Sequence, residues 1–431
     1  MQQVPETLLA KSKREGRILS LEQHLLDTEQ AAVSIFRVDG RWGRNWCRFF
    51  GLRDRATQEK FLLNLRIAAL FHDLGKANED FYHAVTHAEF VQQSLRHEHI
   101  SALLLHLPAV RGWLTHNAAL DLEVITAAVL SHHLKASLGS NSKWEWCQSH
   151  RSRILQLFLQ HGEVKAIFER IKLVASLTAI PPLPTVPWTD KSPWSDAWKQ
   201  SVSTAQNFAR QVRHDTERRA LLLAVKAGVI VADAAASGLV REGHTGDKFK
   251  DWIEEVVHDT PIGSHDISDA IIARRIRQIS AKKSFSFHPF QELIATQGSR
   301  VLLLAACAAG KTLAAWKWAE AQARAHDIGK VIFLYPTRGT ATEGFRDYVG
   351  WAPETEAALA HGTARYELEA MLTNPSEATA GKDHQLTEQE ERLFALGLWS
   401  RRYFSATVDQ FLSFMETVVK TPGLASPCTM K

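Results

Sequence analysis

Cysteine is scarce in this chain of 431 residues, and its four cysteines stand far apart with no Cys-x-x-Cys pair among them. This spacing excludes a thiolate zinc finger and a disulfide framework, which indicates a reducing compartment. Long hydrophobic runs are also lacking: no segment reaches the roughly 18 uninterrupted apolar residues of a membrane span. No signal-peptide core follows the start of the chain. The sequence predicts a soluble, cytoplasmic protein without a membrane partner.

A strong excess of one charge is missing too, since the formal net charge is only +4 at pH 7. Such a balance permits a nucleic-acid partner without indicating one. The apolar fraction of 45% and the charged fraction of 23% place the chain among ordinary globular proteins. Its length is sufficient for two domains.

A histidine–aspartate pair after an apolar helix stands out in the first half. Residues 61–70 are apolar at helical spacing without Gly or Pro, so His72 and Asp73 should end a buried helix. Gly75 suits a C-terminal helix cap. An adjacent imidazole and carboxylate can hold a divalent cation and suit Mn, Fe, Co, Ni or Zn better than Ca. Lys76 follows about one helical turn after Asp73 and could neutralise a phosphate oxygen.

Two further histidines occur in similar settings. His24 lies in a predicted helix over 19–33 and, taken alone, reads as a polar residue on a half-exposed helix. His97 lies at the start of an apolar helix over 96–105. Either could be a metal ligand if the fold brings it to the His72–Asp73 pair.

The ends of two more apolar helices carry candidates. His132 and His133 follow the helix over 122–130, as a cationic pair at the helix end or as ligands. Asp233 lies inside an apolar helix over 217–240. A buried, unpaired carboxylate costs several kcal/mol, so Asp233 needs either hydrogen bonds from a neighbouring loop or a cation.

Together these positions give seven candidate metal ligands: His24, His72, Asp73, His97, His132, His133 and Asp233. Seven are enough for two metal ions that share Asp73 as a bridge. Two cations about 4 Å apart can clamp a phosphodiester, generate hydroxide from a bridging water and stabilise the leaving oxygen. The pattern therefore predicts a two-metal hydrolase with Asp73 and Lys76 as catalytic residues.

The order of these motifs, with His72-Asp73-Leu74-Gly75-Lys76 as its centre, resembles the HD nuclease domain of the CRISPR-associated nuclease–helicases of type I interference systems. The resemblance covers about the first 245 residues. It implies one metal on His24, His72, Asp73 and Asp233, and a second metal on Asp73, His97, His132 and His133. It also implies cleavage of single-stranded DNA with Mn, Ni, Co or Fe, and an RNA-guided type I interference complex as partner.

The second half contains a strand, a loop and a helix in the order that a phosphate-binding loop requires. Residues 299–304 read as a buried strand, Gly310-Lys311-Thr312 close the loop, and a helix follows over 313–325. Backbone amides would hold the phosphates of ATP, Lys311 would reach the outer ones, and Thr312 would hold Mg. Ala305 stands where such loops normally have Gly, which limits the conformations of the loop.

Other segments of this half resemble helicase motifs. Gln291, ahead of the loop, resembles the Q motif that reads adenine, and its segment also reads as a helix start with Pro289 in the first turn. A strand over 330–338 and the segment 402–411 resemble motifs that touch a DNA strand. The nucleic-acid contacts implied by this resemblance are Thr337, Arg338, Thr407 and Gln410.

No Asp-Glu-x-His strand, second RecA-like domain or arginine finger follows in the sequence. We therefore expect weak ATP binding at best and no strand translocation. The chain reads as an N-terminal piece from a truncated, frameshifted or split gene. A separate chain that supplies the rest of the helicase is one expected partner.

The expected fold class is α plus α/β. An all-α HD metal-dependent nuclease domain spans 1–245, a linker 246–284, and a partial RecA-like superfamily 2 helicase domain 285–431. The expected function is a metal-dependent endonuclease for single-stranded DNA in antiviral defence. The alternatives are an HD-type nucleotide phosphohydrolase regulated by its P-loop half, and a catalytically silent remnant.

Overall fold

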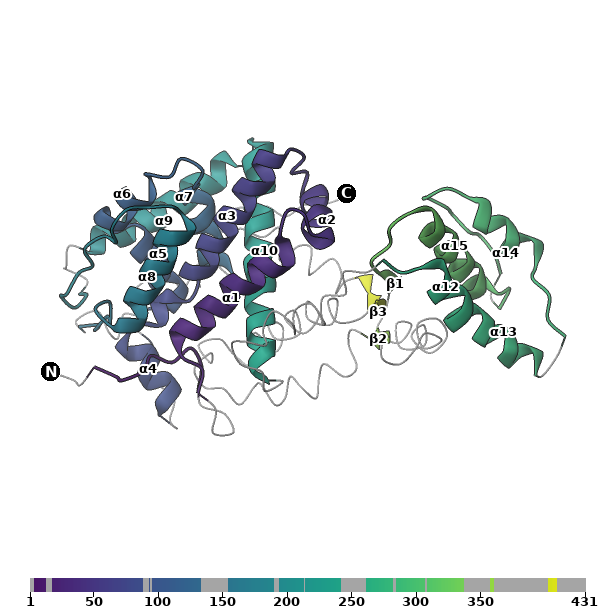
Figure 1. Ribbon diagram of the computed structural model, residues 1–431, viewed down its shortest axis with the longest axis horizontal. Coiled ribbons are helices and arrows are strands. Elements are labelled where there is room, and N and C mark those ends of the chain that lie inside the picture. Colours follow the sequence, from purple (N-terminus) through teal and green to yellow (C-terminus); the bar gives the residue numbers. More distant parts are fainter. Residues whose placement is uncertain are drawn as a thin grey trace. The chain divides into compact units, whose positions relative to one another are not determined.

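The computed structural model divides the chain into two compact units, one with the described residues up to 241 and one with those from 261 onward (Figure 1). The described residues are 4–12, 18–87, 93, 95–132, 154–189, 194–212, 214–241, 261–281, 284–306, 308–336, 357–359 and 402–408.

The first unit is helical, as the sequence predicts. Its elements are α1 (Leu21–Phe36), α2 (Arg41–Phe50), α3 (Arg55–Phe71), the 3-10 helix η1 (Leu74–Lys76), α4 (Glu79–Thr86), α5 (His97–Leu105), α6 (Pro108–Leu114), α7 (Leu122–Ser131), α8 (Gly162–Val174), α9 (Trp194–Gln211) and α10 (Thr216–Arg241). The predicted helices around the candidate ligands correspond to α1, α3, α5, α7 and α10. Their existence is confirmed, with shifts of a few residues at their ends.

The long helix α10 packs against α1, α3 and α7 (Figure 1). Its part Thr216–Ser237 is the one helix in the described ranges that is long and apolar enough to cross a membrane, and 89% of its most apolar window is buried inside the structure. The apolar surface of α10 is therefore covered by neighbouring helices. This is the pattern of a core helix that is hydrophobic on all sides.

Side-chain caps fix where three ligand-bearing helices begin. Ser20 accepts from the amide of Gln23 at the start of α1, and Asp54 accepts from the amide of Thr57 at the start of α3. Asp121 does the same for α7. Each cap satisfies an amide that has no partner inside its helix, and so defines the phase of the helix that follows.

Gly75 does not cap α3, and that expectation is wrong. The C-cap of α3 is His72 in the right-handed helical conformation, and Gly75 lies inside η1. Among the described glycines only Gly51 and Gly310 have a positive φ. Gly75 is needed for a different reason, the close approach of α5.

The second unit contains helices and a small parallel sheet. Its elements are α12 (Ser264–Ile267), the π-helical η4 (Ser268–Ile272), α13 (Ala273–Ser280), α14 (Pro289–Leu293), the 3-10 helix η5 (Ile294–Thr296), α15 (Lys311–Ala325), β1 (Val331–Tyr335), β2 (Ala357–Leu359) and β3 (Tyr403–Thr407). The sheet order is β1-β3-β2, and Val331 and Ala357 both pair with Tyr403. Trp316 of α15 packs on Phe333 and Tyr403, which joins helix and sheet.

The prediction of a buried strand over 299–304 is wrong. These residues form no strand, and Leu302 and Leu304 are each 83% exposed. The apolar run alone suggested a strand, but the sheet in the described part of the chain gives it no hydrogen-bonding neighbour. Apolar composition does not make a strand without one.

Part of the predicted linker is folded. Helices α12, η4 and α13 lie within residues 246–284, and Ile267 and Ile271 pack in the same core as Trp316. The domain boundaries remain a prediction, because residues 242–260 lie outside the described part.

Candidate metal centre

Six of the seven candidate ligands meet in the first unit, although they come from five different parts of the fold. His24 lies in α1, His72 caps α3, Asp73 directly follows, His97 opens α5, His132 caps α7 and Asp233 lies in α10. All six are at least 93% buried. His133 lies outside the described residues. The ligand roles of all seven remain predictions.

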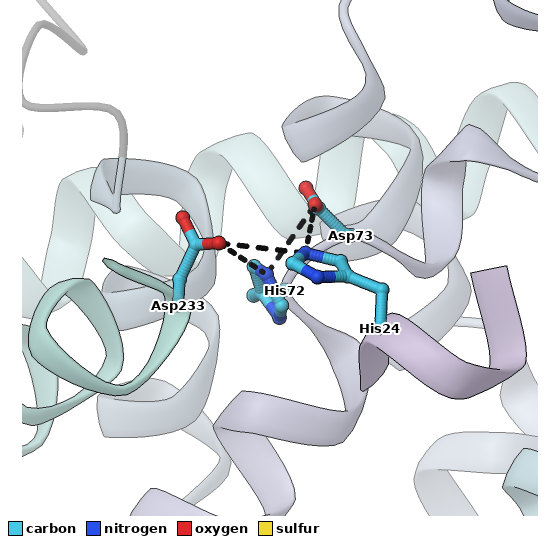
Figure 2. Close-up of side chains that lie close together, drawn as sticks. All are labelled: His24, His72, Asp73 and Asp233. Carbon is cyan, nitrogen blue, oxygen red and sulfur yellow. Dashed lines mark hydrogen bonds and ion pairs between the residues drawn. The ribbon is translucent and has the colours of Figure 1, made fainter. Parts of the chain in front are cut away.

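One oxygen of Asp73 faces the first group of side chains (Figure 2). Asp73 Oδ2 lies 3.1 Å from His24 Nε2 and 3.4 Å from His72 Nε2. Asp233 Oδ1 lies 3.4 Å from His24 Nε2 and 3.9 Å from His72 Nε2. Two imidazoles and two carboxylates therefore face one point, and their ligand atoms all lie within 4.8 Å of one another.

The other oxygen of Asp73 faces a second group. Asp73 Oδ1 lies 3.1 Å from His97 Nε2 and 3.4 Å from His132 Nε2. These three ligand atoms also lie within 4.8 Å of one another. The carboxylate of Asp73 thus belongs to both groups, one oxygen to each, as a bridging ligand would.

Backbone carbonyls orient two of the histidine rings. His72 Nδ1 lies 2.7 Å from Ala69 O, and His132 Nδ1 lies 2.6 Å from Val129 O. A carbonyl only accepts, so each neutral ring carries its proton on Nδ1 and presents a lone pair at Nε2. His72 Nε2 has no hydrogen-bond partner among the described residues and faces two carboxylates. Electron-pair donors that converge in this way fit a metal cation.

The charges of the cluster also suit a metal. Burial alone would raise the pKa of Asp73, but the Lys76 ammonium and the surrounding histidines His72, His132 and His24 hold it well below its usual range. Burial lowers the pKa of His132, which favours a neutral ligand over a cationic helix end at this residue. For His72 burial acts in the same direction, but Asp73 and Asp233 outweigh it and raise the pKa. An ionised carboxylate is the form that binds a metal, and a cation held at Asp73 and Asp233 would take the place of the proton that these carboxylates favour on His72.

The family of the chain follows from comparison with known proteins. A family model described as "Cas3, HD domain" matches residues 9–239, which is more than half of the chain. The chain belongs to the Cas3 HD-domain family. It is also 30% identical over 388 residues to a protein of Myxococcus xanthus (strain DK1622) named "Putative CRISPR-associated nuclease/helicase Cas3". That alignment covers 88% of this chain and 48% of the relative, so the chain spans about half the length of the curated relative.

His24 and Lys76 of this HD unit are both buried. His24 is fully buried, so its reading as a half-exposed polar residue is wrong. Lys76 is 5% exposed, and its Nζ lies 2.7 Å from Asp73 Oδ2 and donates to Ala10 O at 3.1 Å. It also lies over the ring of Phe81. The ammonium is thus paired with the bridging carboxylate, and its contact with a phosphate remains a prediction.

Sequence reasoning missed the residues that hold the HD segment in place. Ser101 Oγ accepts from the Gly75 amide at 2.8 Å and donates to His72 O at 3.0 Å. Asn78 donates to Gly75 O and accepts from the Phe81 amide, which makes it the N-cap of α4. The acidic residues after Asn78 are a start signal that could have identified this cap. Ser101 has no comparable local signal.

The second half of the chain keeps its candidate nucleotide residues together. Gly310, with φ +88°, precedes α15, and Lys311 Nζ donates to the carbonyls of Ala305 and Ala306. Gln291 donates to Gly310 O and accepts from the His288 amide. The predicted helix start with proline in its first turn is confirmed by α14.

The remaining candidate residues of this half are only partly described. Thr312 is the second residue of α15. Thr407 ends β3, and its side chain lies outside the described part, as do Thr337, Arg338 and Gln410 entirely. The roles given to these residues stay predictions.

Proposed function

We propose that this chain is a metal-dependent endonuclease that hydrolyses phosphodiester bonds of single-stranded DNA in CRISPR interference. The observation that carries the proposal is the buried Asp73 carboxylate, whose two oxygens face two separate groups of metal-ligand atoms. Membership of the Cas3 HD family and the name of the Myxococcus xanthus relative support the substrate class and the setting. The action would be cytoplasmic, with an RNA-guided type I interference complex as partner.

The proposed metals are two divalent transition ions, Mn, Ni, Co or Fe, because the ligands mix imidazole nitrogen with carboxylate oxygen. Such ions, when bound, supply Lewis-acid activation of the phosphate and of a water molecule. The residues of the chain provide the arrangement. Asp73 fixes the distance between the two ligand groups, and the carbonyls of Ala69 and Val129 keep the Nε2 atoms of His72 and His132 aimed into the cluster.

Lys76 contributes charge in this proposal. Its ammonium lies 2.7 Å from Asp73 Oδ2 and offsets the charge of that carboxylate. A second carboxylate, that of Asp233, lies on the other side of the histidines (Figure 2). This keeps a dense group of acceptors ionised in a buried place. Lys76 would act beside Asp73 in the catalytic centre.

For the second half we propose a RecA-like fold that binds ATP and Mg at Gly310, Lys311 and Thr312, beside Gln291. A parallel sheet packed on α15, and a glycine with positive φ before that helix, support it. Lys311 donates to two carbonyls of its own loop, which a phosphate would have to replace. DNA would lie along Thr337, Arg338, Thr407 and Gln410.

The test is cleavage of circular single-stranded DNA with Mn or Ni and without ATP. Circular DNA has no ends, so any product requires an endonuclease. Wild type and Asp39→Asn, which changes an exposed aspartate, should cut, whereas Asp73→Asn should not. Hydrolysis of free nucleotides in place of DNA would instead support the phosphohydrolase.

Thermal unfolding with added Mn or Ni completes the test. A ligand that binds only the native state raises the unfolding temperature. We expect this rise for wild type and its loss in Asp73→Asn. Neither cleavage nor metal stabilisation in the wild type would contradict the proposal and leave a silent remnant.

A further inference from the structure

A short segment near the start of the chain lies against the candidate metal centre. We call residues 8–11 the N-terminal strap. Its Leu8 and Ala10 are 1% and 0% exposed, and the Leu8 amide donates to Glu163 of α8. The Ala10 amide donates to Leu19 O, and the Leu21 amide donates to Leu8 O. Hydrogen bonds thus fix the strap along the entry to α1, the helix that carries His24.

The strap makes two polar contacts toward the centre. The carbonyl of Ala10 accepts from Lys76 Nζ, the ammonium that pairs with Asp73. Lys11 Nζ donates to Ser237 Oγ at 2.6 Å. Ser237 lies four residues after Asp233 on α10, and its Oγ donates to Asp233 Oδ1 at 3.2 Å. A chain of hydrogen bonds therefore runs from the strap to a candidate ligand.

The donors fix the direction of each hydrogen bond in this series. An ammonium only donates, so Ser237 accepts from Lys11 and its own proton is left for Asp233 Oδ1. This oxygen is the one that lies 3.4 Å from His24 Nε2 and faces the ligand cluster. Hydrogen bonds to a metal ligand orient it, and their loss typically lowers metal affinity 10–100-fold.

We propose that Lys11 is a positioning residue of the metal centre, acting through Ser237 on the carboxylate of Asp233. This inference rests on the proposed function, in that it takes the cluster to bind metal. It adds the N-terminal strap to the centre as a supporting part. Positioning by Lys11 and the mere charge of Lys11 have opposite effects on metal affinity. Removal of the Lys11 charge should by itself strengthen the binding of a metal cation, whereas loss of positioning should weaken it.

The experiment measures Mn²⁺ affinity of the full chain without DNA, with free Mn²⁺ followed by electron paramagnetic resonance. Lys11→Met keeps most of the side-chain volume and removes the donor, and Ser237→Ala removes the relay. Each should weaken Mn²⁺ binding roughly 10-fold. The double variant should be little weaker than either single one, because both act through one chain of hydrogen bonds. Lys165→Met, which removes an exposed lysine from α8, should bind Mn²⁺ as wild type does.

The outcomes separate the two claims. If wild type fails to bind Mn²⁺, the proposed function fails and this inference fails with it. If wild type binds but Lys11→Met binds equally well or more tightly, the positioning role alone is overturned. If Lys11→Met does not fold, Ser237→Ala decides, since alanine suits the interior of α10. Unchanged affinity in Ser237→Ala would then overturn the inference.

Discussion

Gly75 lies against the main chain of His97, with no room for a side chain between them. A Cβ on Gly75 would lie 2.0 Å from His97 O and 2.7 Å from Ser101 N. The segment η1 therefore touches the first turn of α5 through backbone atoms. This contact brings His97 Nε2 to 3.1 Å from Asp73 Oδ1, so one absent side chain helps to form the second ligand group.

Gly75→Ala should push η1 and α5 apart. Overpacking of this kind costs about 1–3 kcal/mol, and we expect about 2 kcal/mol of lost stability in urea unfolding. Mn²⁺ binding should weaken as well, because His97 would move away from Asp73. Gly112→Ala is the matched control, since a Cβ there meets nothing within 4 Å and alanine favours helix α6. Equal stability of Gly75→Ala and wild type would refute the contact.

The buried His106 should make the protein sensitive to acid. Its Nε2 lies 3.1 Å from Thr126 Oγ1, and that hydroxyl donates to Leu122 O, so the ring donates from Nε2. Burial, with Arg111 nearby, lowers its pKa from 6.5 to about 4. Below pH 6.5 the unfolded chain therefore takes up a proton that the folded chain does not. Stability should fall between about pH 6.5 and 4, by roughly 3 kcal/mol at most from this residue.

His106→Gln should reduce this dependence, measured by urea unfolding at pH 7.5 and at pH 5. His99 is also buried with its pKa lowered to about 4, so some slope will remain. His116→Gln changes an exposed histidine and should leave the slope as it is in wild type. A slope that is the same in His106→Gln and wild type would show that folding does not lower the pKa of His106.

A buried carboxylate joins three helices. Glu29 of α1 is 1% exposed, accepts from Arg66 of α3 at 2.6 Å, and accepts from Arg170 of α8 at 2.7 Å. Glu29→Gln would turn an amide donor toward a guanidinium that also only donates. Exposed ion pairs contribute at most about 1 kcal/mol and broken buried pairs cost about 3–5 kcal/mol. Because both arginines are partly exposed, we expect a loss of about 2 kcal/mol in urea unfolding.

Glu59→Gln is the control for this change. Glu59 pairs with Arg55 four residues earlier, and both side chains are more than half exposed. Its replacement should cost less than about 0.5 kcal/mol. Equal losses of stability in the two variants would show that burial does not increase the contribution of the Glu29 ion pairs to the free energy of unfolding.

The sequence predicted the helices of the first unit, and the candidate ligands at their ends, because those signals are local. Apolar spacing locates α3 and α7, and the candidate ligands His72, Asp73 and His132 follow directly at their ends. The burial of His24 could not be predicted in this way. It depends on the packing of α1 against α3 and α10, which a single amphipathic helix does not reveal.

Contacts between distant residues were beyond sequence reasoning. Lys11 and Ser237 are 226 positions apart, and Gly75 and Ser101 are 26 apart. In neither pair do the neighbouring residues in the sequence indicate which distant residue is the partner. The error at 299–304 has the opposite origin: its apolar run is a local signal, but a strand also requires a neighbouring strand, which the described sheet does not provide.

The loop before α15 holds one residue in an unfavourable conformation. Ala308 has φ +60°, in the left-handed region that costs a non-glycine residue roughly 1 kcal/mol or more. Ala308→Gly should relieve this and slow hydrogen exchange in α15, measured by mass spectrometry, because local opening would cost more. Ala309→Gly is the matched control: Ala309 is not among the positive-φ residues, so glycine there should only add freedom to the unfolded loop and speed exchange. The same direction of change in both variants would contradict strain at Ala308.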